Sequence, residues 1–180
     1  MIIGIDYSIS SPAITVKTDV NEILHFAFKQ KKKQDCWSKK VTLLELPEWK
    51  TPEERYSKLC NTLLDAVLKL GTVEKAYIEA YAFGGSGMLL NIAEATSVMK
   101  QSLYELNIPI VTLAPTEIKK ASTGKGNAKK GDMAKAFIEK TGEDIFSWFN
   151  IHQDLEKIPA PLTDIVDSYF VLQTGIQVNR

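Results

Sequence analysis

The sequence predicts an α/β fold in which one mixed, five-stranded sheet is flanked by helices, and two patterns indicate it. The first 28 residues hold three short apolar or alternating segments with polar turns between them, as expected for three consecutive antiparallel strands. After residue 50, helical periodicities alternate with short apolar segments, which is typical of strands joined by helical crossovers. With 180 residues, 44% of them hydrophobic, the chain can bury a core and is expected to form one domain over residues 1–180.

The first strand is expected at residues 1–6, an apolar run rich in β-branched residues that stops at a carboxylate. Two further strands are expected at residues 13–17 and 23–28. The third of these strands contains His25, a lone histidine between apolar neighbours, which we interpret as structural. Residues 30–49 are rich in lysine and are interpreted as a solvated loop. The alternative is a strand and loop that contact a polyanion.

The rest of the chain alternates helices and strands. A helix is expected to begin at Thr51, where Pro52 and Glu54 complete a capping pattern, and to stop at Gly71. The next strand ends at Glu79. The remaining elements are expected to be a helix at residues 88–106, a strand at 108–113, a short helix at 117–122, a helix at 129–141, a surface segment at 140–161 and a last helix from Thr163.

Four carboxylates stand at the edges of these apolar elements, namely Asp6, Glu79, Asp164 and Asp167. Asp164 and Asp167 are three residues apart and therefore project from one face of a helix. Carboxylates that gather without countercharge repel one another, so such a site is expected to hold divalent cations, and oxygen ligands favour Mg²⁺ or Mn²⁺. Two such ions would support metal-assisted phosphodiester hydrolysis. For Asp164 alone, a solvated position in the first helical turn is the preferred account.

Charge and composition exclude other classes of site. Lysine plus arginine equals aspartate plus glutamate at 22 each, but residues 119–130 hold five lysines and no acid, which predicts phosphate contacts. Cys36 and Cys60 lie far apart and no histidine cluster accompanies them, which disfavours a zinc site and a disulfide. The Gly124-Lys125 pair does not match a nucleotide-binding phosphate loop, so no nucleotide cofactor is expected.

The sequence shows no basic leader followed by an apolar segment, and no apolar run long enough for a membrane span. We therefore expect a cytoplasmic or other intracellular protein without a membrane partner.

In the order and spacing of these motifs, the chain resembles the RuvC-type Holliday junction resolvases, which have a ribonuclease H-like fold. The resemblance rests on Asp6, on Glu79 with aromatics nearby, on the stretch 123–129 and on Asp164-x-x-Asp167, and it covers most of the chain. It implies that the four acids bind two Mg²⁺ ions and that Lys119 supports catalysis. It also implies contacts with branched DNA from Tyr81, Phe83, Lys119, Lys120, Lys125, Lys129 and Lys130.

Two departures from that family suggest a divergent branch, viral or organellar. Tyr7 and Ser8 follow Asp6 where the bacterial members usually have Pro-Gly, and residues 29–49 have no obvious counterpart. Other readings stay open: a ribonuclease H-like nuclease for flap DNA or structured RNA, and a non-catalytic nucleic-acid-binding module of the same fold. A sugar-kinase or actin-like ATPase would need a longer chain.

Resolving a four-way junction requires one cut in each of two opposing strands, and one chain has residues for only one site of metal-binding acids. We therefore expect a two-fold symmetric homodimer, in which the partner supplies the second site. The expected interface is the helix at residues 88–106, whose apolar residues cover more of its circumference than one sheet face needs. A deeply buried core helix is the alternative. In the dimer, the Phe83 rings would stack on bases at the junction centre.

Overall fold

The computed structural model describes residues 1–31, 34–81 and 89–178. Within these residues, one mixed sheet has the strand order β4-β3-β2-β1-β5-β6. The antiparallel strands β1 to β3 stand beside the parallel strands β5 and β6, as the sequence predicted. The strands are β1 (Ile2–Asp6), β2 (Ala13–Lys17), β3 (Ile23–Phe28), β4 (Val41–Leu44), β5 (Lys75–Glu79) and β6 (Ile110–Leu113).

The sheet gains a sixth strand, β4, from the lysine-rich stretch that was predicted to be a loop. Val41 to Leu44 pair in parallel with β3, in a register that places Val41 beside His25. The prediction was wrong here because the strand has only three apolar residues, Val41, Leu43 and Leu44, next to a lysine-rich segment, and a strand at the sheet edge needs only one apolar flank. Hydrogen bonds from His25 N–H to the Lys40 carbonyl (2.7 Å) and from Lys29 N–H to the Leu44 carbonyl (2.9 Å) hold β4 in place.

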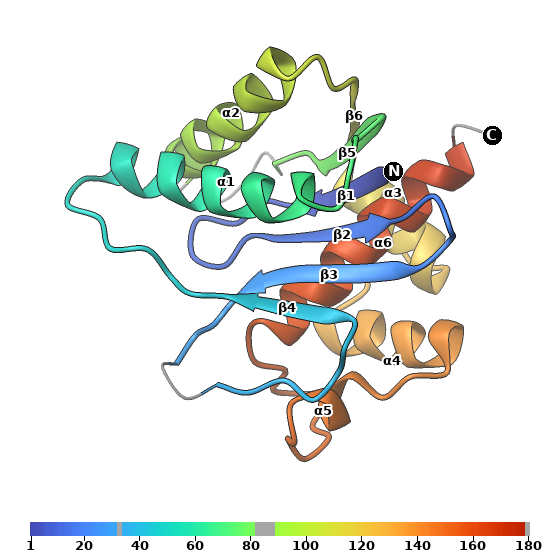
Figure 1. The fold of residues 1–180 in the computed structure, drawn as a ribbon. Helices are drawn as coiled ribbons and strands as arrows, with labels where there is room; N and C mark the ends of the chain where they lie inside the picture. Colours follow the sequence, from blue (N-terminus) through green and yellow to red (C-terminus); the bar gives the residue numbers. More distant parts are fainter. Residues whose placement is uncertain (32–33, 82–88, 179–180) are drawn as a thin grey trace.

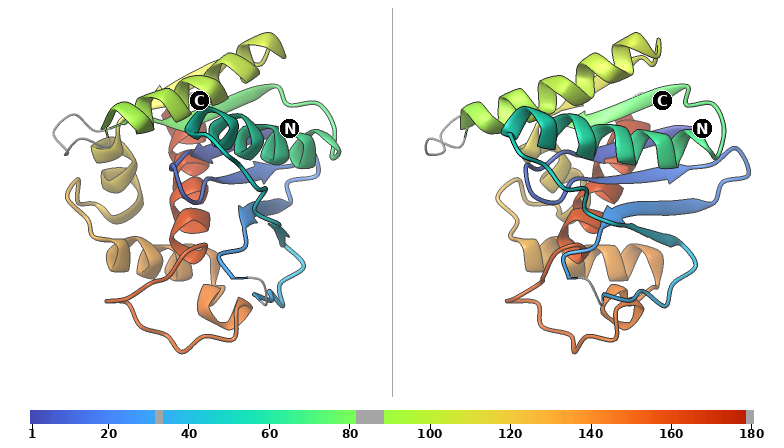
Figure 2. Two further views of the ribbon diagram at one scale, coloured as in Figure 1. Left: turned by 90° about the vertical axis from the view of Figure 1, so that its left-hand side faces the viewer. Right: turned by 60° about the vertical axis from the view of Figure 1, so that its left-hand side comes forward.

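Helices cover both faces of the sheet (Figure 1). The helices are α1 (Pro52–Leu68), α2 (Leu89–Glu105), α3 (Pro115–Thr123), α4 (Lys130–Thr141), α5 (Ile145–Trp148) and α6 (Leu162–Val178). Two further views show α1 and α2 on one face, with α3, α4 and α6 on the other (Figure 2). In the described part of the chain, no helix is long and apolar enough to cross a lipid bilayer.

Local sequence signals explain where α1 begins and where α3 ends. The Thr51 side chain accepts a hydrogen bond from the Glu54 backbone N–H (3.2 Å), which confirms the predicted cap of α1. Gly124 ends α3 with a positive φ of 80°, a backbone conformation that glycine adopts without steric cost. The short helix α5 lies in the stretch that was expected to wrap the surface, and it buries Ile145 and Phe146 completely.

Helix α6 lies directly on β1 because Gly4 leaves room for it. A Cβ atom on Gly4 would stand 2.4 Å from the backbone nitrogen of Leu172, which is far inside van der Waals contact. This close packing holds α6 across the middle of the sheet, above β1, β2, β3 and β5. The first turns of α6, which carry two of the four acids, are thereby fixed relative to the strand ends.

Candidate active site

Asp6 and Glu79 stand side by side at one edge of the sheet. Strands β1 and β5 run parallel with Ile5 beside Ile78, so the next residue of each strand, Asp6 or Glu79, ends its strand at the same level. Ile5 and Ile78 belong to the core beneath α1 and α2. Because side chains alternate along a strand, Asp6 and Glu79 point to the opposite face, which α6 covers.

Helix α6 brings the other two acids to this edge. Asp167 and Glu79 line a small cavity of about 150 Å³, together with Lys119 and Lys130. Asp6 and Glu79 line a second, more open cavity of about 420 Å³, and Lys119 lies in its wall as well. Glu79 and Lys119 therefore connect the two cavities.

Burial raises the pKa values of all four acids, and the charges of neighbouring acids add to this effect for Asp6 and Asp167. Burial, followed by the negative charges of Asp167, Glu79 and Asp164, raises the pKa of Asp6 well above its ordinary value. Burial, followed by the charge of Glu79, raises the pKa of Asp167 to about 7. Burial also raises the pKa of Glu79, which the positive charge of Lys119 opposes. The carboxylates are therefore close enough to hinder each other's ionisation, and the nearby lysines compensate only in part.

Asp164 is held by a short chain of hydrogen bonds that the sequence analysis did not identify. The Ser11 hydroxyl donates to Oδ2 of Asp164 (2.7 Å), and the Gln30 amide donates to the Ser11 oxygen (2.9 Å). Asp164 is only 7% exposed, so a solvated helix face, the preferred account of this residue taken alone, is wrong. A serine five residues after Asp6 is too common a feature to identify this contact from sequence.

The donor set fits a hard divalent cation. Four carboxylates, with no histidine or cysteine among them, are the ligand chemistry of Mg²⁺ or Mn²⁺, and a cation would relieve the repulsion that raises their pKa values. In the described residues, no three acidic, histidine or cysteine side chains stand close enough together to enclose a metal ion as they lie. The acids are gathered at one edge but are not arranged as a closed coordination shell.

The predicted DNA-contacting residues divide into two groups. Lys119 lies in the walls of both acid cavities and Lys130 in the wall of the smaller one. Lys120, Lys125 and Lys129 are exposed on α3 and the following loop, outside the walls of these two cavities.

The two predicted aromatic contacts also differ in position. Tyr81 lies in the wall of the larger cavity beside Asp6 and Glu79. Phe83 falls within residues 82–88, outside the residues that the structure describes.

Comparisons with known proteins agree with this architecture, although no family model matches the chain. The crossover junction endodeoxyribonuclease RuvC of Prochlorococcus marinus is 26% identical over 98 residues, which is 54% of this chain and 63% of that protein. The chain spans 58–63% of the length of the first three curated relatives it matches.

Two solved structures match nearly the whole chain. One is Thermus thermophilus RuvC in complex with a Holliday junction substrate, with a TM-score of 0.58 and 14% identity, covering 98% of this chain and 94% of that one. The other is a yeast mitochondrial Holliday junction resolvase, with a TM-score of 0.54 and 15% identity, covering 96% of this chain and 76% of that one. At these identities, the structural matches establish the fold.

The sheet order, the helices on both faces and these matches define a ribonuclease H-like fold. Within that class, the chain resembles the RuvC-type Holliday junction resolvases in sequence as well as in fold, which confirms the resemblance drawn from its motifs.

Proposed function

We propose that this chain is a divalent-cation-dependent endonuclease that resolves four-way DNA junctions. The observation that carries the proposal is the gathering of Asp6, Glu79, Asp164 and Asp167 at one sheet edge, where burial and the charges of neighbouring acids raise the pKa values of Asp6 and Asp167. Lys119 and Lys130 in the cavity walls add a cationic surface that fits a phosphate. The likeness to RuvC, one member of which was solved with a Holliday junction substrate, supports the choice of DNA.

The four carboxylates would hold the cations, and Lys119 and Lys130 would contact the phosphodiester. Two divalent cations in this position supply an activated water and neutralise charge on the leaving oxygen. Ser11 holds the Asp164 carboxylate in one orientation through its 2.7 Å hydrogen bond. Tyr81, in the wall of the cavity that opens beside Asp6, would stack on a base next to the scissile phosphate.

The test compares a synthetic four-way junction with a linear duplex and a flap of the same sequence, and with a structured RNA. Cleavage of the junction in Mg²⁺ or Mn²⁺, abolished by EDTA, is the expected result. Preferential cleavage of flap DNA or RNA would retain the nuclease chemistry and exclude the junction as substrate. Binding without cleavage of any of these substrates would point to a non-catalytic module and would contradict the proposal.

We also propose that the active form is a homodimer assembled through α2. The helix buries Ala95, Met99 and Leu103 against the core, so these three residues are not available to a partner. Leu90 and Tyr104 are 73% and 74% exposed on the same helix, and they present apolar surface to solvent. An interface on this surface would set the spacing of two acid sites, as paired incisions require.

Light scattering at micromolar concentration should give about twice the chain mass. Leu90→Glu combined with Tyr104→Glu changes only exposed positions and should yield a folded monomer that nicks junctions without paired incision. A wild-type protein that stays monomeric and still makes paired incisions would contradict the dimer while leaving the nuclease proposal intact.

A further inference from the structure

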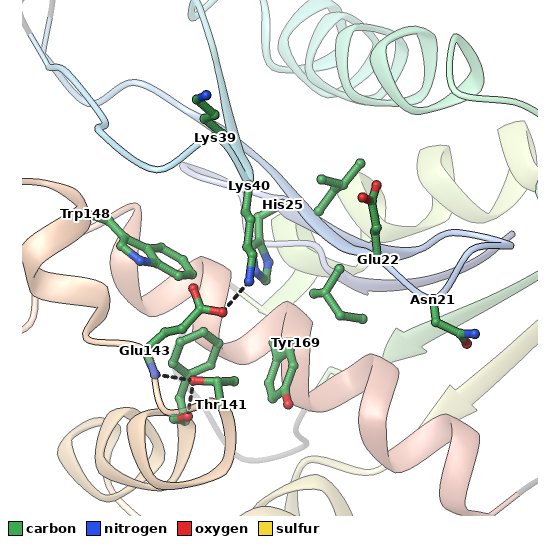
Figure 3. Close-up of a pocket in the computed structure, with 12 residues that line it drawn as sticks. Asn21, Glu22, His25, Lys39, Lys40, Thr141, Glu143, Trp148 and Tyr169 are labelled. Atoms are coloured by element: carbon green, nitrogen blue, oxygen red, sulfur yellow. Dashed lines mark hydrogen bonds and ion pairs between the residues drawn. The ribbon is translucent and has the colours of Figure 1, made fainter.

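A third cavity, of about 510 Å³, lies away from the acids, where β3 meets α4, α5 and α6 (Figure 3). Its lining starts at Asn21 in the β2–β3 turn and runs along β3 to His25. The pairing of the strands places this turn at the opposite end of β1 from Asp6, because Ile2 is level with Lys17 and Ile23. The cavity is therefore separate from the candidate active site, and its volume is that of a small-molecule pocket.

Aromatic rings form the inner wall of this cavity. Phe137 meets Trp148 edge-on at 5.8 Å and Tyr169 edge-on at 4.9 Å between ring centroids. The His25 ring lies 5.7 Å from the Trp148 ring. These contacts hold the rings in fixed orientations and bury most of their surface, so that Tyr169 (6% exposed) and Trp148 (9% exposed) keep more accessible surface than Phe137 (1%).

Hydrogen bonds determine the tautomer of His25. The Ser168 hydroxyl donates to the Ile165 carbonyl (3.0 Å), so the Ser168 oxygen accepts from the Thr15 hydroxyl (2.8 Å). The Thr15 oxygen must then accept from Nδ1–H of His25 (2.9 Å). Burial, with the charge of Lys40, lowers the pKa of His25 to about 3, which keeps the ring neutral. Nε2 is therefore an unprotonated hydrogen-bond acceptor.

The Nε2 edge of the ring is the one that faces the cavity. His25 lines the cavity while Thr15, the partner of Nδ1, is completely buried and does not. The hydrogen bond between His25 and Thr15 uses Nδ1, and Nε2 is not among the fully buried side-chain atoms of the described residues that lack a partner, so it can be reached from the cavity. A hydrogen-bond acceptor that can be reached from an aromatic-lined cavity is the complement of a flat ligand with an N–H group.

Charged groups at the cavity mouth come from two segments, since Lys40 precedes β4 and Glu143 follows α4. Lys40 forms an ion pair with Glu143, which Figure 3 shows beside His25. The Trp37 backbone N–H donates to the Trp148 carbonyl (2.7 Å) and ties the segment before β4 to α5. The stretch without a counterpart among the bacterial resolvases thus builds the outer wall of the cavity.

We propose that this cavity binds a small planar nitrogen heterocycle, of nucleobase or nucleoside size, that donates a hydrogen bond to Nε2 of His25. The ring of the ligand packs against the accessible surface of Trp148 and Tyr169, and a polar substituent such as a ribose reaches Lys40 and Glu143 at the mouth. This site is independent of the nuclease proposal, since it shares no residue with the acid cavities.

Indole and benzofuran test the proposal on the full chain, because they share one shape and only indole has a ring N–H. In calorimetric titrations, indole should bind about twofold to tenfold more tightly than benzofuran, the effect of one hydrogen bond. Adenosine, guanosine, cytidine and uridine form a second set of probes. Tighter binding of a nucleoside than of indole would assign the mouth to a ribose, and the reverse order would assign the site to a bare heterocycle.

His25→Phe should abolish the preference for indole, and Thr15→Val should weaken it because the tautomer is no longer fixed. His152→Phe, which alters the exposed second histidine, is the matched control and should change nothing. Wild-type ¹⁵N spectra of the two histidines give a readout that needs no variant. Saturating indole should shift the unprotonated nitrogen of His25 and leave His152 unaffected. Equal affinity for indole and benzofuran, failure of every probe to bind at millimolar concentration, or an unshifted His25 nitrogen would overturn the proposal.

Discussion

Two regions of the sheet beneath α6, the edge that carries the acids and the region around His25, bury titratable groups in opposite ways, although consecutive residues of the same helix contact them. Asp167 faces Glu79 and Asp6, where burial and like charge raise the pKa values. Ser168 faces Thr15 and, through it, His25, where hydrogen bonds satisfy one nitrogen of a neutral ring. The ionised acids need a cation to compensate their charges, whereas the neutral ring of His25 carries no charge that needs compensation. Burial of a titratable group thus indicates a ligand only when its partners are also considered.

The largest effect should follow removal of a charge from the edge that carries the acids. Asp167→Asn or Asp6→Asn keeps the size of the side chain but removes a metal ligand, so junction cleavage in Mg²⁺ should fall about 10³-fold or more. Asp65→Asn changes an exposed acid on α1 and serves as the control. Cleavage rates measured on folded protein test this prediction. Full activity in Asp6→Asn would contradict the role of the acids as metal ligands.

A smaller effect is expected from the hydrogen bond that orients Asp164. Ser11→Ala removes the donor to Oδ2 but no charge, so Mg²⁺ affinity should fall roughly 10–100-fold, as it does when outer-shell partners of metal ligands are lost. The Mg²⁺ concentration for half-maximal cleavage measures this change, and high Mg²⁺ should restore the rate. Ser57→Ala alters an exposed serine on α1, away from the acids, and is the matched control. An unchanged Mg²⁺ requirement in Ser11→Ala would mean that the bond only supports the fold.

The same comparison explains which parts of the protein could be predicted from sequence. Asp6 and Glu79 could be placed together because parallel strands end at one edge, and the α6 pair because helical spacing fixes their face. Strand β4 could not, since its pairing with β3 outweighs the surrounding lysines only in three dimensions. The Ser11 contact and the His25 cavity combine segments more than 100 residues apart, and no local pattern marks such a meeting.

The pH dependence of stability should separate Asp167 from its neighbours. Its pKa in the fold, about 7, lies above the ordinary value of 3.8, so the native state holds the proton more tightly than the unfolded chain. This contribution is fully present below about pH 4 and is lost as the pH rises through 7. Relative to wild type without metal, Asp167→Asn should therefore gain roughly 2 kcal/mol between pH 5 and 7.

Urea unfolding of both proteins across this range measures the difference, in which the opposite contribution of His25 cancels. The folded pKa of His25, about 3, is lower than its ordinary 6.5, so its contribution is present above pH 6.5 and lost as the pH falls. Mg²⁺ should stabilise wild type more at pH 8 than at pH 6, because it binds the ionised acids. A stability difference that does not change with pH would show that Asp167 titrates near its ordinary value.

The smallest effect, and the sharpest test of which end of the sheet meets DNA, comes from paired lysine substitutions. Lys119→Ala with Lys130→Ala removes the cations beside the acids, while Lys125→Ala with Lys129→Ala removes cations outside the acid cavities. Lys17→Ala with Lys75→Ala removes the same charge at the opposite end of the sheet, level with Ile2.

Each lost phosphate contact should lower the slope of log affinity against log salt by roughly one unit. The first pair should therefore lower the slope for junction binding by roughly two units, and the control pair should leave it unchanged. The second pair should lower the slope by a similar amount if the duplex arm continues along α3 and the start of α4. Fluorescence anisotropy in Ca²⁺, which replaces Mg²⁺ to prevent cleavage, measures the slope for each variant. All three pairs change the net charge equally. An equal decrease of the salt slope in all three variants would therefore show that DNA binding depends only on the overall charge, and would contradict the acid edge as the binding surface.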